Sequence, residues 1–270
     1  VGHTGTLDPL ATGVLPVLIG RGAKAAEYLL SENKAYKAEI KLGITTDTED
    51  ITGNILTKSD TLPTKTEFFE AVKHFVGEIE QIPPMYSALK VDGKKLVDLA
   101  REGITVERQP RKITVYSINS ECIDEKQGVY TLEVECSKGT YIRTICSDLG
   151  DITGYGAYAE SLRRTINGQF SVKDAFTPDE LQKMVEAGDF SFVRDASETI
   201  TFLPEIKLDA KQTKDIKFGR KIAFPFDVKI EDDERIYYRA TSEGKLIAVV
   251  FPAVEKGELV MRIERLYAHD

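Results

Sequence analysis

Cysteine is scarce in this sequence, and its apolar runs are short. The three cysteines, Cys122, Cys136 and Cys146, are odd in number and form no CxxC pair, so they indicate neither a disulfide framework nor a thiolate zinc site. Apolar runs such as 14–20, which Pro16 interrupts, are much shorter than the roughly 20 residues that a membrane-spanning helix needs. No signal-peptide pattern is visible either. We therefore expect a cytoplasmic protein without membrane association.

Basic residues are also in deficit, and the formal net charge is −8. Taken alone, this charge argues against a nucleic-acid partner, because lysine and arginine make the contacts to phosphate. The excess acid lies in residues 1–200, since 201–270 hold 13 basic and 13 acidic residues. Within the acidic part, residues 83–112 reverse the sign, with seven basic and four acidic residues. We expect a local basic surface on an acidic protein.

Periodicity predicts an α+β fold built on a mixed or antiparallel sheet. Alternating apolar and polar residues predict strands at 35–42, 113–119, 129–136 and 157–165, and a short buried strand is predicted at 14–19. Helical spacing and N-cap signals predict helices at 21–30, from Thr64 through Phe75, at 140–149 and from Thr177. These elements follow one another without a regular βαβ repeat, which favours the α+β class.

The chain is long enough for a large domain followed by a small one. We predict a larger domain over 1–200 and a small β-rich domain over 201–270, with strands at 235–240, 245–251 and 258–266. The stretch 82–110 shows helix signals only around 94–101, and loops of this length are usually functional.

The segment Gly2 to Pro9, GHTGTLDP, is the strongest candidate for a functional loop. Its glycines permit a tight, irregular backbone, and Pro9 biases Asp8 toward an extended conformation. The carboxylate of Asp8 would then be presented by the loop. The alternative is a polar loop in which Asp8 is only a turn residue, since Asp-Pro dipeptides favour turns.

The longer string TGTLDPLATGVLP, residues 4–16, resembles the catalytic motif of the TruB family of tRNA pseudouridine synthases. Four more segments resemble family motifs in the same order: NKAYKA at 33–38, QIPPMYSALKVDGKK at 81–95, KGTYIRT at 138–144 and LRR at 162–164. The resemblance implies a pseudouridine-synthase domain with an RNA-clasping insertion at about 83–112, and a small PUA-like RNA-binding domain at the C-terminus. It also leads us to expect a further strand and helix ahead of this segment.

The activity implied by the resemblance is isomerisation of the uridine at position 55 in the T-loop of tRNA. The reaction breaks the C1′–N1 bond, rotates the uracil and joins C5 to C1′, and it requires no cofactor. The implied enzyme is a monomer that binds the T-arm of tRNA and needs no protein partner. Two alternatives stay open: a tRNA-binding folding chaperone that does not need the chemistry, and a synthase of the same fold acting on another RNA.

Each implied site residue has a role in this chemistry. The resemblance implies that Asp8 is the catalytic carboxylate, and we expect Arg143 to contact it and fix its orientation. The resemblance implies that the remaining residues bind the flipped uridine: Tyr36 stacks on the base and is a candidate general base, Tyr141 and Leu162 line its pocket, and His3 fills the vacated space. The alternatives are a surface arginine at 143 and ordinary core packing for Tyr36, Tyr141 and Leu162.

The lysines of the insertion are candidates for contacts to the RNA backbone. Lys90, Lys94 and Lys95 would bind phosphates there, and the alternative is a solvated helix face. We expect no metal, because His3, His74 and His269 have no ligand spacing.

Overall fold

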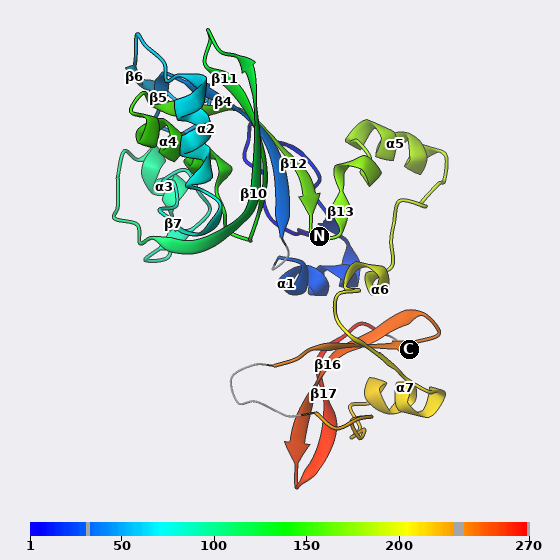
Figure 1. The fold of residues 1–270 in the computed structure, drawn as a ribbon. Helices are drawn as coiled ribbons and strands as arrows, with labels where there is room; N and C mark the ends of the chain where they lie inside the picture. Colours follow the sequence, from blue (N-terminus) through cyan, green and yellow to red (C-terminus); the bar gives the residue numbers. More distant parts are fainter. Residues whose placement is uncertain (31–32, 229–234, 269–270) are drawn as a thin grey trace. The chain divides into compact units, whose positions relative to one another are not determined.

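The computed structural model describes residues 1–30, 33–228 and 235–268 (Figure 1). The chain divides into two compact units, each described here by itself. The sheet unit comprises Gly5–Leu15 and Ser31–Ala175. The C-terminal unit comprises Val1–Thr4, Pro16–Leu30 and Phe176–Asp270.

In the described part of the sheet unit, seven strands form the main sheet, and its neighbouring strands run antiparallel with one exception. In order across the sheet these are β13 (Phe170–Ser171), β12 (Ala157–Asn167), β4 (Lys34–Leu42), β11 (Val129–Cys136), β10 (Arg111–Asp124) and β7 (Gly77–Gln81), with β2 (Thr12–Gly13) parallel to β12. This arrangement confirms the predicted α+β class and its mixed sheet. The strand predicted at 113–119 is longer than expected, because β10 pairs with β11 along almost their whole hairpin.

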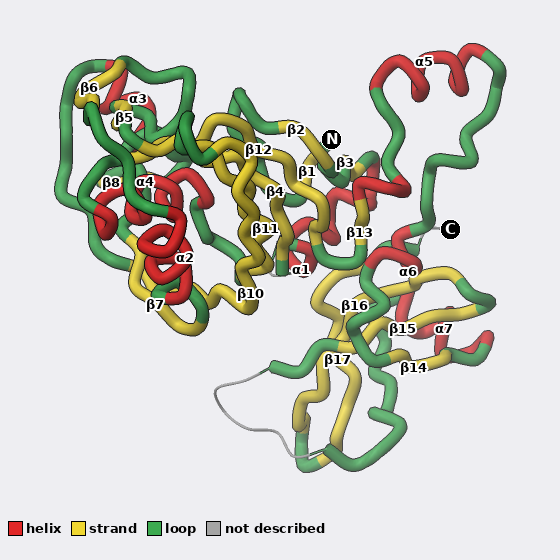
Figure 2. The backbone as a smooth tube through the Cα atoms, turned by 45° about the horizontal axis from the view of Figure 1, so that its top comes forward, coloured by secondary structure: helices red, strands yellow, loops and turns green. Residues whose placement is uncertain are grey.

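Two helices cover one face of this sheet, as Figures 1 and 2 show: α2 (Lys65–Lys73) and α4 (Ile142–Thr153). Phe68 of α2 and Ile145 of α4 are fully buried in one hydrophobic cluster with residues of the central strands. The Phe68 ring stacks on Tyr130 of β11, with 3.9 Å between ring centroids. The helix predicted at 140–149 continues to Thr153 and ends where Gly154 adopts a φ of +82°.

Smaller elements connect these layers. They are the hairpin of β5 (Ile44–Thr46) and β6 (Ile55–Lys58), the hairpin of β8 (Lys90–Val91) and β9 (Lys94–Lys95), α3 (Leu96–Arg101) and the 3-10 helix η2 (Val172–Asp174). The helix signals around 94–101 thus correspond to α3, which begins two residues later because Lys94 and Lys95 pair in the hairpin.

The C-terminal unit is rich in strands, as predicted. Its sheet has the order β14 (Glu205–Lys207), β15 (Tyr238–Ser242), β16 (Lys245–Glu255) and β17 (Glu258–Leu266), and its core also includes Ile216 of α7 (Ala210–Lys217). Its other elements are β1 (Gly2–His3), β3 (Val17–Leu18), the 3-10 helix η1 (Gly20–Ala25), α1 (Ala26–Leu29), α5 (Pro178–Glu186) and α6 (Ala196–Thr199). No helix in the described part of the chain is long and apolar enough to cross a membrane.

Two predictions near the start of the chain were wrong in part. The buried strand predicted at 14–19 is reduced to Val17 and Leu18, and Val17 is 57% exposed. The reason is that the Val14 amide donates to the Arg164 carbonyl of the main sheet, so Val14 does not continue the strand of Val17 and Leu18. The helix predicted at 21–30 begins as the 3-10 helix η1 and is α-helical only over α1.

The N-terminal cap of α2 offers a test of local stability. The hydroxyl of Thr64 accepts from the Glu67 amide, and the Glu67 carboxylate accepts from the Thr64 amide. We expect Thr64→Ala to lower the free energy of unfolding by about 1 kcal/mol, because it leaves a helix donor without its partner. Urea denaturation measures this difference. Thr66→Ala, in the same exposed turn, is the matched control, and equal losses in both variants would contradict the assignment.

Candidate active site

The loop that carries Asp8 is anchored along β12. Gly13 of β2 pairs with Arg164, and the Val14 amide donates to the Arg164 carbonyl at 2.9 Å. Gly13 has a φ of +109°, and a Cβ at this position would lie 2.1 Å from the Arg164 oxygen. Glycine alone fits this close approach of two backbones. The contact explains one of the glycines in the sequence motif.

The side chain of Arg164 holds both ends of the same loop. This arginine is 1% exposed; its Nε donates to the Val14 carbonyl at 2.9 Å and its Nη2 to the Gly5 carbonyl at 3.0 Å. Because Gly5 and Val14 stand on either side of Asp8 in the sequence, one guanidinium sets where the loop begins and ends. The LRR segment had not indicated this role, since the burial of Arg164 depends on a loop 159 residues away.

Asp8 and Arg143 contact each other, as expected from the sequence. Arg143 donates from Nε to Oδ2 of Asp8 at 2.8 Å and from Nη2 to Oδ1 at 3.1 Å. The arginine side chain is 3% exposed, whereas that of Asp8 is 32% exposed. A bidentate pair of this kind fixes the plane of the carboxylate. Asp8 is therefore held firmly on one side and remains accessible on the other.

Arg143 also contacts two further segments of the sheet unit. Its Nη1 donates to the Thr48 carbonyl at 2.7 Å, and its Nη2 donates to the Tyr86 carbonyl at 2.9 Å. Nη1 also lies 3.6 Å from the Asp50 carboxylate. The guanidinium thus joins the Asp8 loop, the connection between β5 and β6, and the entry to the 83–112 insertion. Burial makes these partners necessary, because an unpaired buried charge is costly.

Asp50 was missed by sequence reasoning. Its side chain is 4% exposed, and Oδ1 accepts from the hydroxyl of Thr48 at 2.8 Å, the amide of Thr52 at 2.9 Å and the hydroxyl of Thr52 at 2.5 Å. These bonds orient the carboxylate beside Arg143. The segment TDTEDITG, residues 46–53, could have indicated such a carboxylate, because it is rich in acidic and hydroxyl side chains.

Tyr36 lies on β4, opposite Arg164 on β12 and Val134 on β11. Burial raises the pKa of its phenol to about 12, although the charge and a hydrogen bond of Arg164 act in the other direction. The charge of Asp8 adds to the rise. At neutral pH this phenol keeps its proton and presents a polar but uncharged group near the carboxylate.

Tyr141 and Leu162 lie in different surroundings. Tyr141 is the N-cap residue of α4, directly before Ile142; burial raises the pKa of its phenol, and the charge of Asp8 acts in the same direction. Leu162 lies opposite Ala38 in the central sheet and is 6% exposed within the hydrophobic core. The structure therefore brings Tyr36, Tyr141 and Arg143 together around Asp8, and it places Leu162, a residue of β12, in the hydrophobic core.

His3 belongs to the C-terminal unit, where it is an exposed residue of β1 paired with Val17 of β3. The site built here consists of residues of the sheet unit, and the role implied for His3 stays a prediction. Among the described residues, no group of three or more His, Cys, Asp and Glu side chains could hold a metal ion. His269 lies outside the described residues.

The three candidate lysines gather on one short hairpin. Lys90 pairs with Lys95, and Lys94 lies one residue from the turn at Asp92 and Gly93. Both turn residues have positive φ values, of 51° and 83°, as a tight two-residue hairpin turn requires. All three lysines are exposed. The hairpin, and not a helix face, presents their charges.

A further carboxyl, missed from the sequence, lies on another side of α4. Glu49 has a φ of +62° and accepts from the Thr144 hydroxyl at 2.6 Å. Burial raises the pKa of Glu49, and the bond from Thr144 opposes this rise. Glu49 thus holds the connection between β5 and β6 against the first turn of α4.

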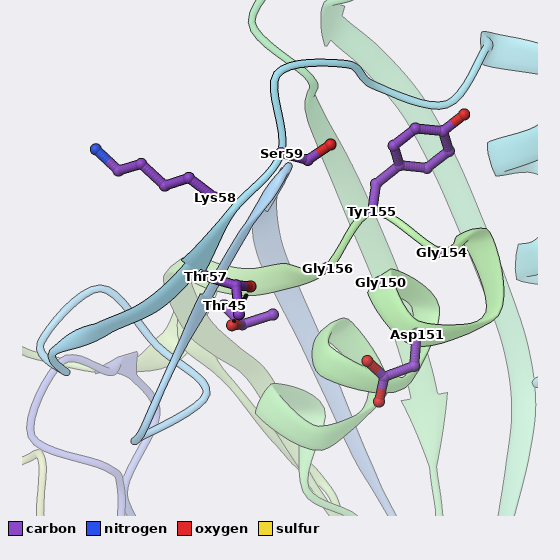
Figure 3. A pocket seen from close by; sticks show the side chains of 9 residues that line it. All are labelled: Thr45, Thr57, Lys58, Ser59, Gly150, Asp151, Gly154, Tyr155 and Gly156. Atoms are coloured by element: carbon purple, nitrogen blue, oxygen red, sulfur yellow. Dashed lines mark hydrogen bonds between the residues drawn. The ribbon is translucent and has the colours of Figure 1, made fainter.

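Figure 3 shows a pocket of about 470 Å³ at the opposite end of α4. It is lined by Thr45, Thr57, Lys58, Ser59, Gly150, Asp151, Gly154, Tyr155 and Gly156. None of the residues around Asp8 lines it. Since α4 rises about 1.5 Å per residue, this pocket is distant from Arg143, and we do not assign it to the active site.

Comparison with solved structures identifies the fold. The chain matches one in the crystal structure of a Cbf5-Nop10-Gar1 complex with a TM-score of 0.71 and 24% identity, covering 98% of this chain and 75% of the other. A chain from an H/ACA RNP bound to a substrate RNA containing 2′-deoxyuridine gives a TM-score of 0.71 and 21% identity, covering 99% and 76%. At these identities the likeness shows the fold alone, which this chain shares with both of those chains.

Sequence comparison then identifies the family. The TruB family pseudouridylate synthase N-terminal domain matches residues 1–142, and the tRNA pseudouridylate synthase B C-terminal domain matches 143–196. The chain is 40% identical over 264 residues to tRNA pseudouridine synthase B of Listeria welshimeri, covering 96% of this chain and 86% of the relative. It is 39% identical over 251 residues to that of Dechloromonas aromatica, covering 93% and 81%. The chain belongs to the TruB family of pseudouridylate synthases.

The buried arginine makes a prediction about stability. Arg143→Met should lower the free energy of unfolding by about 3–5 kcal/mol, because it leaves the buried Asp50 carboxylate without its cation. Urea denaturation measures the change. Arg163→Met, on the exposed face of β12, should stay within about 0.5 kcal/mol of the parent. A similar loss in both variants would show that the Arg143 contacts contribute nothing specific.

Proposed function

We propose that this protein isomerises uridine to pseudouridine in tRNA, at position 55 of the T-loop. The observation that carries the proposal is the pair of Asp8 and Arg143, in which a buried guanidinium holds a carboxylate whose other side is accessible. Membership of the TruB family supports the same activity. A cytoplasmic location, a monomeric state and binding of the T-arm are parts of this proposal.

The reaction is a rearrangement in which the atoms of the substrate balance. The C1′–N1 bond breaks, the uracil rotates, a C5–C1′ bond forms, and the proton on C5 leaves while N1 gains one. An ionised Asp8 serves three possible routes: attack at C1′, addition at C6 of the uracil, or proton abstraction at C2′. The arrangement suits all three, because Arg143 orients the carboxylate before the substrate arrives and no reorganisation is then needed.

Residues near Asp8 can hold the detached base. The flipped uridine costs a few kcal/mol of stacking and pairing, which contacts in the pocket must offset. Tyr36 and Tyr141 offer rings near the carboxylate, and both phenols are protonated at neutral pH. In this proposal Tyr36 stacks on the uracil, Leu162 supports the pocket from the core, and His3 fills the space left in the RNA. Because the phenol of Tyr36 keeps its proton at neutral pH, it must first lose that proton before it can act as a general base.

The exposed lysines of the β8–β9 hairpin supply the RNA contacts in this proposal. Three positive charges on a tight turn form a compact basic surface on a protein of net charge −8. Phosphate contacts of this kind position a nucleic acid without reading its sequence. The shape of the folded T-arm would then contribute to selection, as is usual for structured RNA.

Two alternatives predict other results. A tRNA-binding chaperone needs the hairpin but not an ionised Asp8. A synthase of the same fold that acts on another RNA needs both, and it differs only in where pseudouridine appears. Mapping pseudouridine in the RNA of a deletion strain distinguishes the second alternative from our proposal.

Asp8→Asn is the direct test of catalysis. The amide keeps the shape of the side chain but not its charge, so turnover should fall by about 10²–10⁴-fold or more, while the Kd for tRNA stays near that of the parent. Release of tritium from uridine labelled at C5 measures turnover. Asp60→Asn, an exposed acid on a loop, should be fully active. If Asp8→Asn retained the parental rate, the assignment of Asp8 as the catalytic carboxylate would be refuted.

Replacement of Lys90, Lys94 and Lys95 by alanine tests the hairpin. We expect weaker tRNA binding and a dependence of log K on log salt that is less steep by up to about 3, one for each lost phosphate contact. At saturating tRNA, kcat should change little, because these side chains do not contact Asp8. The control replaces the exposed lysines Lys65, Lys73 and Lys126. An unchanged salt dependence in the hairpin variant would remove it from the RNA interface.

A further inference from the structure

Gln81 forms an unusual contact with the start of α4. This glutamine is the last residue of β7 and is 2% exposed. Its Nε2 donates to the Tyr141 carbonyl at 3.0 Å, and its Oε1 accepts from the Tyr141 amide at 2.8 Å. One carboxamide therefore satisfies both polar backbone atoms of Tyr141, as a neighbouring strand would.

The contact lies at the N-terminus of α4, which has no hydrogen bond from the side chain of its own N-cap residue. Tyr141 is the N-cap residue of this helix, and its side chain makes no capping hydrogen bond. Its carbonyl already accepts the first helical bond, from Ile145 at 3.1 Å. A side chain must donate to the carbonyl and accept from the amide at once, and among side chains of this length only a carboxamide does both at every pH.

The backbone of Gln81 is held in the main sheet. It pairs with Arg111 of β10, and its strand β7 forms one edge of that sheet. The insertion begins two residues later, and its entry contacts Arg143, since the Tyr86 carbonyl accepts from that guanidinium. Gln81 is thus the point at which the sheet, the insertion and the start of α4 are tied together.

We propose that Gln81 is a positioning residue for catalysis: by holding the backbone of Tyr141, it sets the first turn of α4 so that Arg143 reaches Asp8. The inference rests on the proposed function, because its readout is turnover. Arg143 follows Tyr141 by two residues, and its bonds to Asp8, Thr48 and Tyr86 each need donor and acceptor within about 3 Å. A shift of about 1 Å in a reacting group is enough to lower turnover by about 100-fold.

The Gln81→Glu variant distinguishes a positioning role from a purely structural one, because the hydrogen bonds that the new carboxyl group can make depend on pH. A protonated glutamic acid donates to the Tyr141 carbonyl and accepts from its amide, as glutamine does. The carboxylate cannot donate, so it repels that carbonyl. The charged groups that act on Tyr141 are Asp8, Arg111 and Arg143, and they are common to the parent and every variant. The ratio of rates at each pH therefore isolates the new carboxyl group.

The experiment measures kcat and KM for tRNA from pH 5 to pH 9, together with the Tm at each pH. We expect Gln81→Glu to approach the parental kcat at low pH and to lose about 10- to 100-fold as pH rises, since burial raises the pKa of a carboxyl group above its ordinary value. KM should change less than threefold. Gln81→Met should be slow at every pH. Gln127→Glu, an exposed change of the same type, should behave as the parent does.

Other outcomes overturn the inference. A folded Gln81→Met variant with parental kcat and a lowered Tm would show that Gln81 is only structural, and so would a ratio of rates for Gln81→Glu that does not vary with pH. If Gln81→Met does not fold, Gln81→Asn retains donor and acceptor on a shorter stem, and parental kcat in that variant would likewise contradict precise positioning. A parent protein that forms no pseudouridine would refute the proposed function and not this inference alone.

Discussion

The ion pair between Arg143 and Asp8 joins residues that are 135 positions apart in the chain. A buried guanidinium is tolerated only when its donors are satisfied and its charge is paired. Here the partners come from the Asp8 loop, from the connection between β5 and β6, and from the entry to the insertion. None of these segments alone could hold the arginine. The need to satisfy one buried cation therefore brings three parts of the sheet unit to a single point.

The same pair creates an asymmetry that suits catalysis. Its arginine side is buried, while the Asp8 side chain is 32% exposed, so the carboxylate is oriented by the protein and open to a substrate. Arg164 stabilises the loop that carries Asp8 by donating hydrogen bonds to the carbonyls of Gly5 and Val14. Tyr36, whose phenol has its pKa raised to about 12 by burial, adds a neutral polar group beside the charge. A site with preset dipoles of this kind spends little energy on rearrangement during the reaction.

Net charge is a poor guide to the local charge of a surface. The chain carries a formal charge of −8, yet three exposed lysines lie together on the β8–β9 hairpin. Screening limits the reach of exposed charges to about 8–10 Å at physiological salt. A distant acidic surface therefore has little effect on the electrostatic potential at the hairpin. The distribution of charge, set by a tight turn at Asp92 and Gly93, matters more than its sum.

Local patterns were sufficient for the main strands and for the cap of α2, because alternation and a Thr64–Glu67 pair act between near neighbours. The motifs also pointed to Asp8, Tyr36, Tyr141 and Arg143. Asp50, Arg164 and Gln81 could not be found in this way, since their partners lie far away in the sequence and become neighbours only when strands pair. The short strand at Val17 was misjudged for the same reason, as Val14 bonds to Arg164. Residue types and spacing determined which groups could do chemistry; burial and hydrogen bonding across the sheet decided which groups meet, because both depend on contacts that exist only in the folded chain.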